Sequence, residues 1–211
     1  MSSPASPVIA QARALRWAPA GQTVLDLSAL QIPAGVGWVG GGEGRGKSSL
    51  LRALAGALPL PGSHLQIGGH VLAQAPAAYR AQVFWMDPRS TAHDAEVAAQ
   101  WLATTAARYP QWDAALLQDL CEALDLRPHL DKPLYMLSTG SKRKVWLAAA
   151  CASGAPLTLL DEPFAALDKT SIRCLLGVLG DAAAQPQRAW VLADYVAPPG
   201  VPLAWQLDLG D

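Results

Sequence analysis

Hydrophobic residues in the first ninety positions occur in short runs bounded by glycine and proline, a pattern typical of strands that enter turns. The predicted strands are 24–32, 36–39, 64–67, 70–73 and 83–85. A glycine cluster at 40–46 follows the second strand, and the composition of 48–55 favours a helix. This region therefore contains a strand, a loop and a helix in direct succession.

The spacing of apolar residues changes to that of helices between about 92 and 134. The repeating residues are Val97, Trp101 and Thr104 in the first part and Leu116, Leu120 and Leu124 in the second. We predict a small helical subdomain at 90–136.

Strand and helix patterns alternate in the last third of the chain. A helix is predicted at about 140–150, a buried strand at 157–160, a helix at 169–179 and a strand at 189–193. Such alternation indicates an α/β fold with a mainly parallel sheet covered by helices on both faces. We expect one domain over 1–211, with 1–89 and 137–211 forming its core, and a small antiparallel β region in addition to the parallel sheet.

Composition excludes several classes of protein. The chain has 211 residues, 51% hydrophobic and 16% charged, which fits one compact domain. Its net charge of -1 disfavours nucleic acid as a partner. Three cysteines form no Cys-x-x-Cys pair, and we expect them to be reduced thiols. The start is unlike a signal peptide, and the most apolar region, 145–160, is too short for a membrane helix, so a cytoplasmic protein is expected.

A phosphate-binding motif follows the second predicted strand. Residues 41–48 read Gly-Gly-Glu-Gly-Arg-Gly-Lys-Ser and match the Walker A pattern, between a strand and a helix as the motif requires. Backbone amides of the loop bind phosphate, Lys47 reaches the β and γ phosphates, and Ser48 binds Mg²⁺. The predicted ATP-binding residues of the loop are Gly41, Gly42, Glu43, Gly44, Arg45, Gly46, Lys47, Ser48 and Ser49. A plain glycine-rich turn is the simpler alternative.

Two carboxylates follow the buried strand at 157–160, in the sequence Leu-Thr-Leu-Leu-Asp-Glu-Pro. A parallel strand delivers such groups to the edge of the sheet beside the phosphates. Asp161 is predicted to support Mg²⁺ together with Ser48. Glu162 is predicted to orient or deprotonate the attacking water and forms, with Lys47, the catalytic pair. The alternative is a pair of solvated acids at a strand end.

The order of these motifs resembles that of the ATP-binding cassette (ABC) ATPases over nearly the whole chain. Residues 137–141, Leu-Ser-Thr-Gly-Ser, look like the signature sequence, with Thr139 and Ser141 in place of the commonest Gly and Gln. Residues 164–168, Phe-Ala-Ala-Leu-Asp, look like the D-loop and end at Asp168. Trp17 stands where the family stacks an aromatic ring on adenine, although a lone tryptophan is more often a core residue.

The resemblance implies a P-loop NTPase fold of ABC type and a head-to-tail dimer, either homomeric or heteromeric. ATP is then held between the Walker motifs of one subunit and the signature segment of the other, where Ser138 and the Gly140 amide contact the γ phosphate. A helix N-cap is the simpler role for Ser138, and both roles are compatible. The helical subdomain is expected to bind an integral membrane subunit and so to hold the chain at the inner face of the membrane.

The sequence departs from the family at the switch histidine. All four histidines precede the strand at 157–160, so the position after the last predicted strand falls on Asp194 or Tyr195. The sequence aligns in two registers here. Neither residue supplies an imidazole to the γ phosphate, and Asp194 adds negative charge.

The hinge into the helical subdomain also lacks its glutamine. No glutamine occurs from 83 to 99, and the position falls on Met86 or Asp87, of which only Asp87 can bind Mg²⁺ effectively. Glu43 places a further carboxylate in the phosphate loop, which Arg45 can offset. These departures suggest a specialised or weakened ATPase.

Two functions follow from the sequence. The first is the nucleotide-binding subunit of an ABC transporter, which uses ATP and Mg²⁺, is expected to pair with a second ABC subunit as a homodimer, and drives a separate membrane protein. The second is a degenerate cassette that binds ATP but scarcely hydrolyses it and acts as a regulatory or structural module. Cassettes of this length also occur in haem-export systems for cytochrome assembly.

Overall fold

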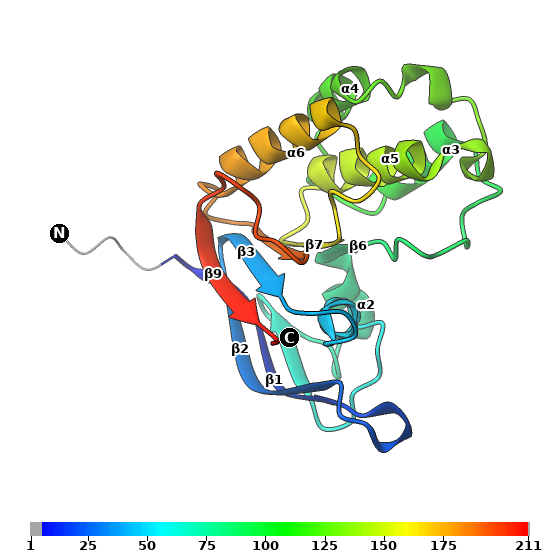
Figure 1. The fold of residues 1–211 in the computed structure, drawn as a ribbon. Helices are drawn as coiled ribbons and strands as arrows, with labels where there is room; N and C mark the ends of the chain where they lie inside the picture. Colours follow the sequence, from blue (N-terminus) through cyan, green and yellow to red (C-terminus); the bar gives the residue numbers. More distant parts are fainter. Residues whose placement is uncertain (1–5, 211) are drawn as a thin grey trace.

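The computed structural model describes residues 6–210, which contain two sheets (Figure 1). The antiparallel sheet has four strands in the order β2-β1-β4-β5: β1 (Val8–Trp17), β2 (Leu25–Pro33), β4 (His64–Ile67) and β5 (His70–Val71). The parallel sheet has five in the order β6-β7-β8-β3-β9: β3 (Gly35–Gly40), β6 (Val83–Trp85), β7 (Leu157–Asp161), β8 (Ala189–Ala193) and β9 (Leu203–Asp208). The signal-peptide prediction falls largely on 1–5, outside the described residues.

Helices cover both faces of the parallel sheet. They are α1 (Lys47–Leu54), α2 (Pro76–Ala81), α3 (Ala98–Ala106), α4 (Ala114–Ala123), α5 (Thr139–Ala152) and α6 (Lys169–Ala182). Helix α1 contacts β7, β8 and β1 and so lies between the two sheets, whereas α5 and α6 lie on the opposite face (Figure 1). The α/β fold with a mainly parallel sheet and a small antiparallel region is confirmed.

Side chains of the central strands alternate between two hydrophobic cores. Leu159 and Val191 point into the core shared with α1 and the antiparallel sheet, and their neighbours Leu160 and Leu192 point into the core beneath α5 and α6. All four are nearly or fully buried. Because successive side chains of a strand face opposite ways, a strand buried on both faces must be apolar throughout.

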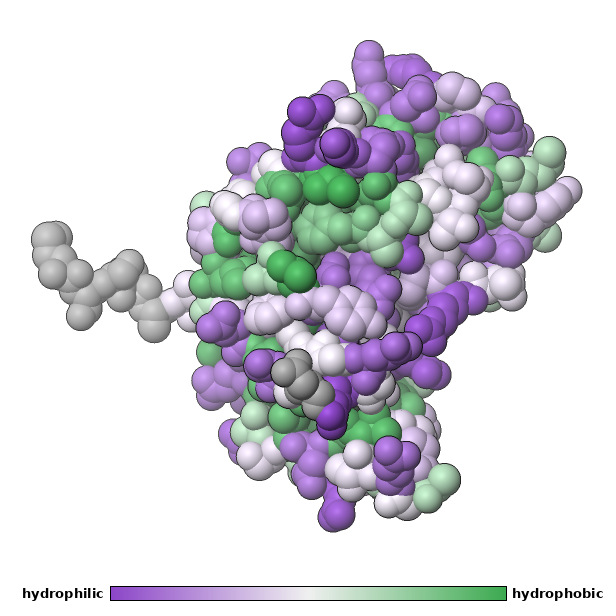
Figure 2. Space-filling view, in the orientation of Figure 1, coloured by the Kyte–Doolittle hydropathy of each residue, from purple (hydrophilic) through white to green (hydrophobic). Residues whose placement is uncertain are grey.

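The segment 90–136 contains α3 and α4 and two 3-10 turns, η2 (Arg127–His129) and η3 (Leu134–Met136). Trp101 and Leu120 belong to the same core as Val145 of α5. Thr104, placed on the buried face by the sequence, is exposed, and the neighbouring Thr105 is buried instead. On the face drawn in Figure 2, hydrophilic residues predominate around α4 and hydrophobic residues form a band next to α6. None of the helices within 6–210 combines the length and hydrophobicity of a membrane-spanning segment.

Three elements were not predicted from the sequence: β1, α2 and β9. The alternation of β1 breaks at Ala14, whose φ of 52° lets Ala12 and then Leu15 face the core. Strand β9 is an edge strand with half-exposed alternate residues, and Trp205 lies across Gly37 of β3, where a Cβ atom would be only 2.1 Å from the indole. Strand β5 ends at Val71, two residues earlier than predicted.

Candidate functional site at the carboxyl edge of the parallel sheet

The carboxyl ends of three parallel strands meet at one edge of the sheet. Val39 of β3 and Asp161 of β7 both pair with Ala193 of β8. The chain leaves β3 into the glycine loop, β7 into the carboxylates, and β8 into Asp194 and Tyr195. Since ligands of open α/β sheets bind outside the carboxyl ends of strands, this edge is the candidate site.

A pocket of about 290 Å³ lies at this edge. Its lining residues are Val24, Glu43, Gly44, Arg45, Gly46, Lys47, Ser48, Ser49, Arg89, Glu162 and Tyr195. The structure thus brings most of the predicted loop residues together with Glu162. Gly41 and Gly42 contribute through their carbonyl groups to the position of Lys47.

The glycine loop folds as a left-handed turn into α1. Gly44 and Gly46 have φ values of 75° and 96°. A Cβ atom on Gly46 would lie 2.5 Å from the Val24 carbonyl oxygen, so only glycine fits between this loop and β2. Helix α1 begins at Lys47 directly after the turn, so its unpaired amides and positive dipole end face the pocket.

Lys47 is 6% exposed and therefore belongs to the packed floor of the pocket. Its Nζ donates to the carbonyl oxygens of Gly41 at 2.5 Å and Gly42 at 2.8 Å. The same Nζ lies 3.9 Å from the centre of the Tyr195 ring, a cation–π contact.

Asp161 and Ser48 have the donor chemistry of a magnesium site. Burial raises the pKa of the Asp161 carboxyl group, and the nearby Ser48 hydroxyl lowers it, so the two side chains lie close together. Within 6–210, Asp161 Oδ1 is buried without a hydrogen-bond partner. A carboxylate oxygen with a free lone pair next to a hydroxyl fits Mg²⁺, which is commonly held by one or two protein oxygens plus substrate phosphates.

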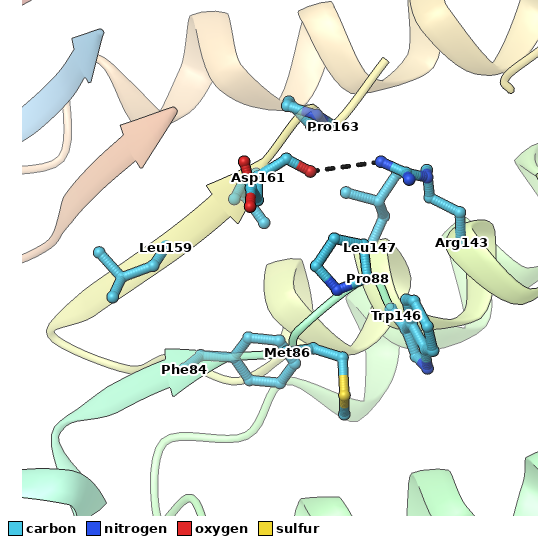
Figure 3. Close-up of a pocket in the computed structure, with 10 residues that line it drawn as sticks. Phe84, Met86, Pro88, Arg143, Trp146, Leu147, Leu159, Asp161 and Pro163 are labelled. Atoms are coloured by element: carbon cyan, nitrogen blue, oxygen red, sulfur yellow. Dashed lines mark hydrogen bonds between the residues drawn. The ribbon is translucent and has the colours of Figure 1, made fainter. Parts of the chain in front are cut away.

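The backbone of Glu162 is fixed by two strands and a helix. Its φ is 45°, its amide donates to the Ala193 carbonyl oxygen at 2.8 Å, and its own carbonyl accepts from Arg143. Arg143 also donates to the Asp161 carbonyl oxygen at 3.3 Å, and Figure 3 shows its side chain reaching from α5 to the end of β7. Burial lowers the pKa of Arg143, whereas the charge of Glu162 raises it.

Arg143 was not identified as a site residue from the sequence. It stands in a run of three basic residues after the signature-like segment, where a solvated position is the usual expectation. Its two bonds to backbone carbonyls show instead that it joins α5 to the strand end that carries both carboxylates.

Of the two candidates for the switch position, Tyr195 faces the pocket. Its ring contacts Lys47, and it lines the pocket, whereas Asp194 accepts a hydrogen bond from the Tyr195 amide at 2.7 Å. Burial raises the pKa of Asp194, and that amide bond lowers it. Strand β8 ends at Ala193, and the two residues that follow it point in different directions. Only the structure therefore shows which of the two faces the pocket.

The two candidates for the hinge position also differ in their surroundings. Met86 packs against the hydrophobic core near Phe84 and Trp146 (Figure 3). Asp87 accepts a hydrogen bond from the Arg89 amide at 2.9 Å, and its charge raises the pKa of Asp161. Asp87 is therefore the candidate whose charge acts on Asp161.

The signature-like segment begins α5. The Ser138 hydroxyl accepts from the Ser141 amide at 3.1 Å and donates to Ser141 Oγ at 3.0 Å, so Ser138 is the N-cap. A Cβ atom on Gly140 would lie 2.5 Å from the Ala166 carbonyl oxygen, which requires glycine here. Ser138 and Thr139 are exposed, and no residue of 138–141 lines the phosphate-loop pocket of the same chain.

The D-loop-like segment leads into α6. Asp168 is its N-cap, accepting from the Ser171 amide at 2.9 Å and from Lys144 Nζ at 2.6 Å. The Lys144 hydrogen bond, followed by those from Ser171, lowers the pKa of Asp168. Ala166 in the same segment has a φ of 60°.

Trp17 ends β1 and packs, partly buried, against the core between the sheets. Its carbonyl oxygen accepts a bond from the amide of Val24 at 2.9 Å, and Val24 lines the pocket. Trp17 is not itself one of the lining residues, so the ring stands beside the phosphate-loop pocket and not in it.

Comparison with known proteins agrees with this geometry. A model of the ABC transporter family matches residues 29–165, more than half of the chain. This chain belongs to the ABC transporter family. It is an ATP-binding subunit of the ABC transporter type, because the family model matches and its curated relatives are named as ATP-binding export proteins.

Two relatives carry the name cytochrome c biogenesis ATP-binding export protein CcmA. The protein from Pseudomonas savastanoi pv. phaseolicola is 34% identical over 170 residues, which is 80% of this chain and 79% of that protein. The protein from Rhodospirillum rubrum is 36% identical over 167 residues, which is 77% of this chain and 68% of that protein.

Solved structures show the same fold. An ATP-binding subunit of an ABC transporter superposes with a TM-score of 0.78 at 23% identity, covering 89% of this chain and 80% of that one. A putative ABC transporter ATP-binding protein from Pyrococcus furiosus gives 0.73 at 19% identity, covering 95% and 96%. The expected P-loop fold of ABC type is confirmed.

Proposed function

We propose that this chain binds and hydrolyses ATP with Mg²⁺ to drive a separate membrane-embedded partner. The observation that supports this most is the meeting of Lys47, Glu162 and the Asp161–Ser48 pair at one sheet edge. The loop amides and Lys47 hold the phosphates, and Glu162 accepts a proton from the attacking water. Ser48 and Asp161 would hold Mg²⁺, which neutralises phosphate charge when bound.

The ATP site is proposed to be completed by a second subunit. Ser138 and Gly140 are exposed or half-exposed at the start of α5 and lie outside the pocket of their own chain, which supports a role toward a partner's nucleotide. We propose that Thr139, Ser141 and the D-loop residue Asp168 lie at the same joint. The aromatic platform for adenine is proposed to be Trp17.

The membrane partner is proposed to belong to an export system of cytochrome c biogenesis. This rests on the names of the relatives, which are similar over most of the chain. We propose that the segment 90–136 acts as the helical subdomain that contacts this partner, with 1–89 and 137–211 as the nucleotide-binding core. Such contact would hold the chain at the inner face of the membrane. Nucleotide-dependent copurification with the partner from gently solubilised membranes tests this, and a chain that binds no ATP would contradict it.

Substitution of Ser138 tests the joint between subunits. Ser138→Arg is expected to leave ATP binding to the monomer intact and to abolish ATP-induced dimers, because a long charged side chain is placed where the second subunit must approach. Light scattering with and without ATP measures this. Ser138→Ala removes the N-cap, at a cost of about 1 kcal/mol, and the hydroxyl contact without adding bulk, so it should weaken ATP-induced dimers less than Ser138→Arg does. Normal dimers of the arginine variant would rule out the sandwich.

A second candidate function, a cassette with little hydrolysis, is favoured by one observation. The Tyr195 ring stands on the Lys47 ammonium at 3.9 Å, at the position where the family supplies an imidazole. Tyrosine donates only through its hydroxyl group, and its pKa is raised by desolvation and by the nearby charge of Glu162.

Restoring the imidazole distinguishes the two functions. Tyr195→His is expected to raise turnover about threefold to tenfold with little change in ATP affinity, because a ring N–H then faces the γ phosphate. Asp194→His, the matched control, is expected to give no increase, since its side chain is turned toward the Tyr195 amide. Phosphate release by the dimer is the measurement. A fast parent enzyme that neither histidine improves would contradict a weakened site.

A further inference from the structure

Arg89 lies in the segment between β6 and α3 and lines the phosphate-loop pocket together with residues of the glycine loop. Two hydrogen bonds form the turn that carries it. Its amide donates to Asp87 Oδ1 at 2.9 Å, and the Ser90 amide donates to the Asp87 carbonyl oxygen at 3.0 Å. The backbone at Arg89 is therefore fixed, while its side chain is exposed toward the pocket.

The Arg89 guanidinium has no protein partner in the part of the chain that the structure describes. Neither the ion pairs nor the side-chain hydrogen bonds within 6–210 include it. The two other basic side chains near the strand ends are engaged: Lys47 bonds two carbonyls and Arg143 bonds two more. Arg89 thus keeps all its donors free for a ligand in the pocket.

The charge of Arg89 acts at the catalytic end of the pocket. It lowers the pKa of Asp161, which burial raises, and it lowers the pKa of Tyr195, which desolvation raises. Arg89 also lines the same pocket as Glu162 and Tyr195, which follow β7 and β8. It therefore lies at the end of the pocket where Glu162 and the attacking water would meet the outermost phosphate.

Arginine suits this place chemically. The planar guanidinium presents a fixed fork of donors that matches two phosphate oxygens at once and is always charged. The carboxylates Glu43 and Glu162 line the same pocket, and Asp161 and Asp194 lie near enough to Glu162 for its charge to raise their pKa values. The terminal phosphate therefore arrives in a negative environment. A free cation there offsets both the carboxylates and the charge of the phosphate.

We propose that Arg89 binds the terminal phosphate of ATP within its own chain and supplies the cationic contact that Tyr195 cannot. This role of Arg89 rests on the proposed function, because it adds a further residue to the site proposed for ATP. Arg89 then discriminates ATP from ADP, which lacks the group that Arg89 contacts, whereas Lys47 and the glycine loop bind both nucleotides.

The test compares affinities of the monomer for ADP and for the non-hydrolysable β,γ-imido analogue of ATP, both with Mg²⁺. Arg89→Ala is expected to weaken binding of the analogue about tenfold and binding of ADP less than twofold, as loss of one charge-assisted contact requires. Arg89→Lys should retain part of the preference. Arg52→Ala, which removes an exposed arginine of α1, should bind both nucleotides as the parent does.

A combined variant sharpens the test. Tyr195→His in the Arg89→Ala background should restore binding of the analogue more than it improves the parent, because the two side chains then serve the same phosphate. If thermal unfolding shows that Arg89→Ala is less stable than the parent, Arg89→Gln is measured instead. It must show the same selective loss of affinity for the ATP analogue.

Three results would contradict the role proposed for Arg89 or the function on which it rests. An unchanged ratio of the two affinities in Arg89→Ala would show that Arg89 does not reach the terminal phosphate. Equal weakening for both nucleotides would make it a general counter-charge for the carboxylates. Failure of the parent chain to bind either nucleotide would instead remove the proposed function itself.

Discussion

Lys47→Ala is expected to weaken binding of both ATP and ADP by about a hundredfold, measured by calorimetry or fluorescence with Mg²⁺ present. The change removes the ammonium group at the floor of the phosphate-loop pocket, and a charge-assisted contact to phosphate contributes about 1.5–3 kcal/mol. Each 1.4 kcal/mol corresponds to tenfold in affinity. The loss should extend to ADP because Lys47 stands on the loop carbonyls of Gly41 and Gly42, at the base of the pocket.

Because Lys47 is nearly buried, its removal also affects packing, and a second variant separates the two effects. Lys47→Met keeps an unbranched apolar stem of similar length and removes the charge. It should lose nucleotide binding as Lys47→Ala does while unfolding at a temperature closer to that of the parent. Lys132→Ala removes an exposed lysine as a control. Undiminished affinity in Lys47→Met would contradict the assignment of this loop to phosphate.

Much of the fold could be predicted because its signals are local. The strand at β8 was predicted with the bounds that the structure shows, since a run of apolar residues between polar ones is a short-range pattern. Strand β1 was missed because its alternation of buried and exposed residues is interrupted at Ala14, where φ is positive. Strand β9 was missed because its residues alternate between half-exposed and exposed, so that this edge strand resembles a loop in composition.

The candidate site was predictable only where it is contiguous in sequence. The glycine loop and the two carboxylates each form a single motif, and the parallel sheet brings them to one edge. The choice between Asp194 and Tyr195 depends on how the chain turns after β8, which no local pattern encodes. Arg143 acts on the site through bonds that span 18 and 19 residues, and Arg89 faces the pocket from another segment again.

The roles assigned to individual residues remain predictions, and Glu162 is the one whose removal should affect catalysis most. Glu162→Gln is expected to lower the steady-state rate of ATP hydrolysis by about two to four orders of magnitude, the usual contribution of a positioned general base. An amide cannot accept the proton of the attacking water. Affinity for ATP should stay close to that of the parent, and the ATP-bound dimer should accumulate because hydrolysis no longer opens it.

The contacts that hold Glu162 in place should be unaffected by this substitution. Its backbone is held by the Ala193 carbonyl and by Arg143, and neither contact involves the carboxylate. Glutamine has the same shape and should adopt the same left-handed backbone, so a loss of rate would report on proton transfer and not on folding.

The control is Glu122→Gln, which makes the same chemical change at an exposed residue of α4 whose pairing with Arg127 on the surface contributes little to stability. It should hydrolyse ATP at the parent rate. Phosphate release measures hydrolysis, and size-exclusion chromatography with ATP measures the trapped dimer. If Glu162→Gln hydrolysed ATP as fast as Glu122→Gln, another group would have to take the proton. Asp194 would then be the first to test, because it lies at the end of the neighbouring strand and burial raises its pKa toward that of a usable base.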